Sequence, residues 1–210
     1  MIDSLLRKLR KGGLDRKSSN DREEGIFSLA SAYITLEIKL GLTSTNRCGI
    51  CIKNVNGTYF SDTVSEVQEF LKISSNEFQT EYVVVNDKYG YLWIMLKGMS
   101  VEDILVASNG IADVIIDRGF KDQMLAAAFE FRKVVTPSSN LDRTQLEPQF
   151  LIFNYKRGKF YPFVPLGAQE KRRNDYELTL MSIISKEVPW EADMNVWYPM
   201  WEMPFDKLRI

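Results

Sequence analysis

The two cysteines, Cys48 and Cys51, have the C-x-x-C spacing of redox-active dithiols and of half a four-cysteine zinc site. The residues around them favour a β-strand, and side chains three positions apart on a strand point to opposite faces of the sheet. The chain contains neither a histidine nor a second cysteine pair that would complete a metal site. We therefore predict buried apolar cysteines, and we expect neither a metal nor another cofactor.

The absence of histidine excludes Ser-His-Asp and Cys-His catalysis and every imidazole general base. No Walker A loop, dinucleotide-binding glycine motif or nucleophile elbow is present either. We favour a protein that is not an enzyme. The alternative is an enzyme acting on an anionic small molecule, for which Tyr89, Tyr91 and Lys156 are the candidate residues.

Two basic clusters lie in the C-terminal half of the chain. Lys156, Arg157 and Lys159 surround Gly158 in an expected turn, and Lys171-Arg172-Arg173 follows shortly afterwards. If the two clusters fold back together, they could bind phosphate, lipid headgroups or an acidic helix. The alternative is a solvated turn and a solvated helix face, with local partners for the cations at Glu170, Asp175 and Glu177.

Aromatic residues are concentrated in the same region and are interspersed with prolines. They are Phe160, Tyr161, Phe163, Trp190, Trp197, Tyr198 and Trp201. Aromatic side chains dominate interface hot spots, which makes Phe160, Tyr161, Trp197 and Trp201 candidate partner-binding residues together with the cations Lys156, Arg157, Lys159, Arg172 and Arg173. The alternative is burial inside the domain, with the prolines fixing an irregular chain path around the rings.

Hydrophobic periodicity and turn residues predict the elements that position these side chains. The expected strands are 47–55, 58–60, 82–85, 91–96, 124–135, 150–155 and 160–164, and the expected helices are 26–40, 61–71, 100–119 and 169–186. Asn56-Gly57 favours a hairpin turn, Ser100 a helix N-cap and Gly41 a helix C-cap. We therefore predict an α+β fold, a mostly antiparallel sheet built from hairpins and covered by three to four helices.

The first 24 residues differ in character from the rest of the chain. A basic amphipathic segment contains Leu5, Leu6, Arg7, Lys8, Leu9, Arg10 and Lys11. Leucines among cations are typical of a helix that binds an anionic membrane or a partner helix, and packing on the chain's own domain is the alternative. Residues 14–24 are charged and polar, which predicts a linker. We thus expect a segment and linker at 1–24 and a single domain at 25–210.

Composition limits the classes of partner. Hydrophobic residues make up 45% of the chain and charged residues 26%, which predicts a soluble globular protein. A net charge of -1 provides no overall attraction for nucleic acid, so we expect no nucleic-acid partner. The low cysteine content favours a cytoplasmic protein, and the inner face of the membrane is the alternative location. The oligomeric state stays open.

Four blocks together resemble the PspA-associated protein family of the AB type. They are Ser31-Ala32-x-x-Thr35-Leu36-Glu37-x-x-Leu40-Gly41-Leu42, Asp87-x-Tyr89-Gly90-Tyr91-x-Trp93, Tyr155-Lys156-Arg157-Gly158-x-Phe160-Tyr161-Pro162-Phe163 and Trp197-Tyr198-Pro199-x-Trp201. The similarity extends over residues 28–204 and provides no catalytic residues. It implies a role in the membrane-stress response linked to PspA, also called the phage-shock response.

These observations lead to one principal hypothesis and two alternatives. The principal hypothesis is a non-enzymatic accessory protein that binds the charged helices of a PspA-like coiled coil. Because a helix-covered antiparallel sheet also resembles secretion-chaperone-like domains, binding of a client protein is a close variant. The first alternative is a peripheral membrane protein that binds the membrane surface through residues 1–11 and the basic turns. The second alternative is the enzyme described above.

Overall fold

The structure is a computed structural model and describes residues 16–134, 147–167 and 170–208. The membrane-binding segment predicted at residues 5–11 lies outside the described residues. Within them, no helix is both long and apolar enough to cross a membrane. The described part of the chain therefore contains no membrane-spanning helix.

In the described part of the chain, six strands form one open antiparallel sheet with the order β2-β3-β1-β4-β5-β6. The strands are β1 (Leu42–Lys53), β2 (Glu81–Asn86), β3 (Tyr91–Lys97), β4 (Met124–Lys133), β5 (Gln149–Asn154) and β6 (Lys159–Phe163). Two hairpins, β2-β3 and β5-β6, lie at the two edges, and β1 pairs with β3 and β4 in the centre. The predicted antiparallel α+β class is confirmed.

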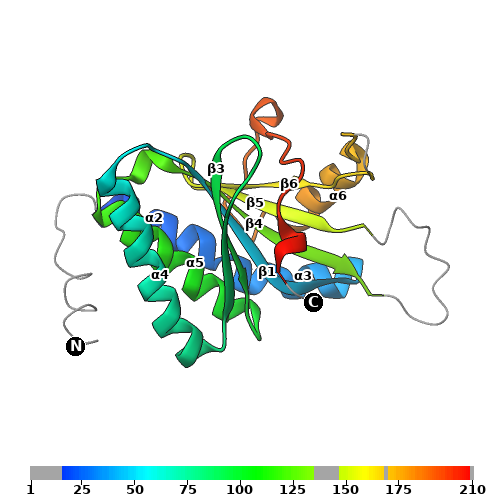
Figure 1. The fold of residues 1–210 in the computed structure, drawn as a ribbon. Coiled ribbons are helices and arrows are strands. Elements are labelled where there is room, and N and C mark those ends of the chain that lie inside the picture. The colour runs from blue at the N-terminus through cyan, green and yellow to red at the C-terminus, as the bar shows by residue number, and fades with distance from the viewer. Residues whose placement is uncertain (1–15, 135–146, 168–169, 209–210) are drawn as a thin grey trace.

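Helices cover one face of this sheet (Figure 1). They are α2 (Arg16–Phe27), α3 (Leu29–Leu40), α4 (Thr58–Phe78), α5 (Val101–Asp117) and α6 (Asn174–Ile184). Ser100 forms a capping box with Asp103 at the start of α5, and Gly41 ends α3 with a φ of 62°. Both predicted caps are confirmed. They could be predicted because a cap depends on residues that are close in sequence.

The other face of the sheet is covered by chain that is not helical. Along β3, Leu92, Ile94 and Leu96 pack toward the helices, whereas Trp93 and Met95 point to the opposite side. That side is covered by the tail, which we define as residues 188–208 and which passes in front of the sheet in Figure 1. The tail contains two short 3-10 turns, η3 (Met194–Val196) and η4 (Phe205–Lys207).

The tail begins by extending the edge of the sheet. The backbone N–H of Phe160 donates to the carbonyl of Pro189 at 2.8 Å, and Glu191 N–H donates to the Phe160 carbonyl at 2.9 Å. These bonds occupy backbone groups at the outer side of β6, which would otherwise be an unpaired sheet edge. The tail then crosses the sheet, where Trp197, Phe205 and Leu208 are buried.

Two local predictions were wrong. Thr58, expected to start a strand after an Asn56-Gly57 hairpin, is the first residue of α4, and Phe60 packs edge-on against Phe120 with ring centroids 5.0 Å apart. Residues 16–24, expected to form a linker, belong to α2. The buried guanidinium of Arg22 hydrogen bonds to Asp113 of α5 at 2.5 Å, so a tertiary contact holds this polar segment.

Candidate functional site

The turn between β2 and β3 is organised by Asp87. Its carboxylate accepts hydrogen bonds from the backbone N–H groups of Tyr89 and Tyr91, both at 2.9 Å, and from the indole Nε1 of Trp93 at 2.9 Å. Gly90 adopts a φ of 84°, which a residue with a side chain rarely adopts. The turn therefore holds two exposed tyrosines in fixed positions at the end of the hairpin.

The turn between β5 and β6 presents the first basic cluster. The side-chain oxygen of Asn154 accepts from the backbone N–H of Lys156 at 3.1 Å and of Arg157 at 3.3 Å. The Arg157 guanidinium ion-pairs with Glu191 of the tail, and this contact lowers the pKa of the Glu191 carboxyl. Within the described residues Lys156 forms no ion pair, so its exposed ammonium is available to a ligand.

The tail supplies the third group of side chains. The Tyr161 hydroxyl of β6 donates to the carbonyl of Tyr198 at 3.1 Å, and the Trp197 indole donates to the Glu191 carbonyl at 3.0 Å. Trp201 packs edge-on against Phe163, with ring centroids 4.9 Å apart. These contacts hold the Trp-Tyr-Pro segment of the tail against β6.

These three segments meet at one cavity of about 580 Å³, which we call the tyrosine cavity. Buried side chains that line it are Cys51, Trp93, Ala126 and Tyr161, and more exposed ones are Tyr89, Tyr91, Lys156, Tyr198 and Trp201. Tyr89, Tyr91 and Lys156, the candidate residues for an enzyme acting on an anionic small molecule, thus line the same cavity. The volume lies in the range of about 300–1,000 Å³ that is typical of small-molecule sites.

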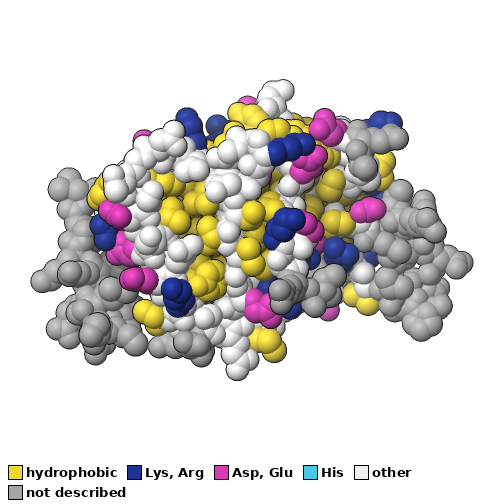
Figure 2. Space-filling view, in the orientation of Figure 1, with side chains coloured by type: hydrophobic (Ala, Val, Ile, Leu, Met, Phe, Trp, Pro, Cys, Tyr) yellow, Lys and Arg dark blue, Asp and Glu magenta, His cyan; other side chains and the backbone are white. Residues whose placement is uncertain are grey.

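The surface around the tyrosine cavity belongs to the helix-free side of the sheet. Figure 2 shows hydrophobic side chains gathered in the middle of this side, with charged side chains spread around them. Exposed aromatic side chains surrounded by charged and polar groups are typical of a binding surface.

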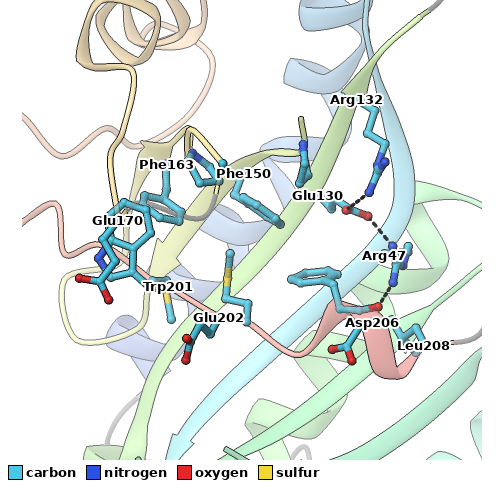
Figure 3. A pocket seen from close by; sticks show the side chains of 16 residues that line it. Arg47, Glu130, Arg132, Phe150, Phe163, Glu170, Trp201, Glu202, Asp206 and Leu208 are labelled. Carbon is cyan, nitrogen blue, oxygen red and sulfur yellow. Dashed lines mark hydrogen bonds and ion pairs between the residues drawn. The ribbon is translucent and has the colours of Figure 1, made fainter. Parts of the chain in front are cut away.

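A second cavity, of about 600 Å³, lies on the same side and shares Met200 and Trp201 with the first (Figure 3). Phe150 and Phe163 line its apolar part. Its charged lining residues are Arg47, Glu130, Arg132, Glu170, Glu202 and Asp206. Met200 and Trp201 of the tail therefore lie between two cavities on the same face of the sheet.

A buried carboxylate organises the second cavity. The Glu130 side chain is 1% exposed and accepts from Arg47 at 3.0 Å, Arg132 at 3.1 Å and the Thr45 hydroxyl at 2.8 Å. Arg47 also donates to the carbonyl of Phe205 and lies over its ring, with the guanidinium carbon 5.3 Å from the ring centroid (Figure 3). These charges hold the tail to the sheet. The sequence alone did not reveal the contact between Arg47 and Phe205, because the two residues are distant in the chain.

Arg172, a predicted partner-binding residue, has its guanidinium committed to the fold. It donates to Glu177 from Nε at 2.9 Å, to the Trp197 carbonyl at 2.8 Å and to the Pro162 carbonyl at 3.1 Å. Burial raises the pKa of Glu177, and Arg172 opposes that rise. Arg172 thus joins β6, α6 and the tail.

The structure places the two basic clusters at opposite ends of β6. Lys159 begins the strand, whereas the backbone N–H of Arg173 donates to the carbonyl of Val164 just beyond its other end, at 2.9 Å. Phe160 and Trp197 are buried and support the sheet and the tail, and Tyr161 is buried below the tyrosine cavity. Of the predicted partner-binding residues, Lys156 and Trp201 line that cavity in more accessible positions.

The cysteines lie on opposite faces of the sheet, as predicted. Cys48 packs among the helix-side residues and Cys51 on the tail side, and both are free thiols. Burial raises the pKa of both thiols, that of Cys51 to about 12, with a further upward contribution from the charge of Asp87. The prediction of buried apolar cysteines is confirmed.

The fold and the site together define a single-sheet α+β protein with a cavity on the face that the tail covers. An open antiparallel sheet carries helices on one face and an aromatic tail on the other, and the tail lines a cavity with the two edge hairpins. The family PspA associated protein B matches residues 1–205, and the chain belongs to that family. Neither the curated proteins nor the solved structures gave a match.

Proposed function

We propose that this protein is a non-enzymatic accessory module of the PspA-linked membrane-stress response and acts by binding a protein partner, a PspA-like coiled coil. The observation that supports it is the meeting of three sequence-distant segments at the tyrosine cavity. Each segment belongs to a block that resembles the family pattern, and the family name links the chain to PspA. A role in the cytoplasm is part of the same proposal.

The chemistry of the surface fits a charged helical partner. Tyr89, Tyr198 and Met194 expose large side chains on the β2–β3 turn and the tail, and aromatic residues and methionine are enriched at protein interfaces. Lys156 adds an unpaired positive charge within the described part of the chain. An acidic residue of the partner helix would complement that charge and increase the rate of association.

The experiment is a binding titration of the full chain with purified PspA from the same organism, at low and moderate salt. We expect Lys156→Glu to weaken binding about tenfold at low salt and less at moderate salt, because salt screens exposed charges. We expect Tyr198→Ala to weaken binding at both salt concentrations, because it removes apolar contact area. The carbonyl that accepts from Tyr161 belongs to the backbone and remains in this variant.

Lys72→Glu is the matched control, since it makes the same charge change on α4, on the helix side of the sheet. Arg157→Glu is unsuitable, because it would place two carboxylates together at Glu191. No binding of PspA by the folded wild-type chain would overturn the proposed partner. Equal binding by wild type, Lys156→Glu and Tyr198→Ala would overturn the proposed surface.

A further inference from the structure

We propose that the tyrosine cavity binds a small aromatic carboxylate or a similar planar organic anion. The planar body lies among the aromatic rings and the anionic group lies at Lys156. This inference goes beyond partner binding and holds whether or not a protein docks on the same face. It concerns binding and involves no chemical step.

The lining of the cavity favours a planar apolar group. Rings from both edge hairpins and from the tail, including Trp93, Tyr161 and Trp201, surround the same space of about 580 Å³. Trp93 and Tyr161 are buried, and such rings form offset or edge-to-face contacts with an aromatic ligand. An aliphatic chain would gain burial but not these ring contacts.

The polar lining of the cavity offers one charged partner to a negative group, the ammonium of Lys156. Lys156 is the one lysine or arginine that lines it within the described residues. Asp87 is the one carboxylate of that lining, and its oxygens accept three hydrogen bonds from their own hairpin. The lining donors include the Lys156 ammonium and the hydroxyls of Tyr91 and Tyr198, groups that suit a carboxylate.

The walls of the cavity are fixed before a ligand enters. Asp87 orders one turn, Asn154 orders the other, and the bond from Tyr161 to the Tyr198 carbonyl holds the tail. An ion pair between Lys88 and Glu202 also joins the β2–β3 turn to the tail. A preformed site loses little conformational freedom on binding, which favours affinity for a small ligand.

The second cavity provides an internal comparison. It is similar in volume, about 600 Å³, but Glu170, Glu202 and Asp206 line it in addition to the paired Glu130. Its two arginines, Arg47 and Arg132, are both bound to Glu130. A carboxylate ligand would meet repulsion there, so the proposal applies to the tyrosine cavity alone.

The test is a calorimetric titration of the full chain with three probes that share one ring system. They are 2-naphthoate, the uncharged 2-naphthalenemethanol and the cationic 2-naphthylmethylammonium. We expect saturable binding of 2-naphthoate, about fivefold weaker binding of the alcohol and the weakest binding of the ammonium ion, because only the first complements Lys156. Quenching of tryptophan fluorescence provides a second readout, because Trp93 and Trp201 line the cavity.

Two variants locate the binding. Lys156→Gln is expected to abolish the preference for the anion, whereas Lys72→Gln on α4 should retain it. Ala126→Leu adds volume at the buried wall of the cavity and is expected to remove binding of all three probes. The same variant should retain PspA binding, since Lys156 and Tyr198 are unchanged, which separates this proposal from the proposed function.

Three results would each overturn the inference. They are no saturable binding of 2-naphthoate by the folded wild-type chain, equal affinity for all three probes, and unchanged binding by both Lys156→Gln and Ala126→Leu. If Ala126→Leu does not fold, Lys156→Gln decides alone, because an exposed side chain without an ion pair in the described structure can be replaced without loss of the fold.

Discussion

Replacing Arg172 by methionine tests whether the guanidinium of this residue stabilises the fold. Methionine keeps much of the chain length but removes a guanidinium that donates to Glu177, Trp197 and Pro162. The change therefore breaks contacts among α6, the tail and β6 at once. We expect a large loss in the free energy of unfolding.

The magnitude follows from the burial of Glu177. Its side chain is 1% exposed, and without Arg172 its one remaining donor in the described structure is the Val164 N–H at 2.8 Å. Removing one partner of a buried ion pair costs about 3–5 kcal/mol. Arg172 itself is 18% exposed, so water reaches part of the site and we expect about 3 kcal/mol. For a chain of this size that loss lowers Tm by about 6–12 °C.

The loss should also depend on pH. Burial raises the pKa of Glu177 above its ordinary value of 4.5, and removing Arg172 raises it further. A raised carboxyl pKa contributes stability below the unfolded-state pKa, and that contribution is lost as pH rises through the folded-state pKa. The deficit of Arg172→Met is therefore smaller near pH 4 than at pH 7, because a neutral carboxyl does not need the guanidinium.

The assay is urea unfolding followed by tryptophan fluorescence at both pH values. Arg173→Met is the matched control, because Arg173 pairs at 3.4 Å with Asp175, which is 75% exposed, and such pairs contribute about 0.5 kcal/mol. The reasoning would be refuted if the two variants lost equal stability at pH 7. A deficit of Arg172→Met that did not change with pH would refute the role assigned to Glu177.

Three further predictions concern other parts of the fold. Glu130→Ala should cost about 3 kcal/mol in urea unfolding, because it leaves Arg47 without its buried partner, and a loss below 1 kcal/mol would contradict this. Ser100→Ala should cost about 1 kcal/mol by removing the cap of α5, with recovery in Ser100→Thr as the check. Both cysteines should resist a thiol reagent at pH 8 until denaturant is added, and fast native labelling of Cys51, whose pKa is about 12, would disprove that.

Most of the sheet and several helix ends could be predicted because their signals are local. Ser100 and Asp103 are three residues apart and form the capping box themselves. Side chains alternate along any strand, so Ile94 and Met95 of β3 point to opposite faces of the sheet, and both faces are buried. The local pairing of Arg172 with Glu177 was also foreseen as an alternative, since the two residues are five positions apart.

Tertiary contacts explain what local reasoning missed. Asn56-Gly57 favours a hairpin, but the chain begins a helix at Thr58, and Phe60 of that helix packs against Phe120. The charges of α2 resemble those of a linker until Arg22 is seen beside Asp113. In both cases the deciding partner lies many residues away.

The candidate site could be predicted only in part, for the same reason. Its blocks were identified from their residue types, but their meeting depends on the strand order β2-β3-β1-β4-β5-β6 and on the path of the tail. Neither is encoded in the spacing of Tyr89, Lys156 or Tyr198. The burial of Trp197 likewise follows from the path of the tail.

The contact between Arg47 and the tail has a kinetic consequence. Arg47 and Phe205 are 158 positions apart, and contacts that close so long a loop are expected to form late in folding. Interactions that are absent from the folding transition state act on the rate of unfolding. Weakening this contact is thus expected to shorten the lifetime of the native state and to leave the refolding rate nearly unchanged. The tail would then determine how long the aromatic sheet face stays covered once folding is complete.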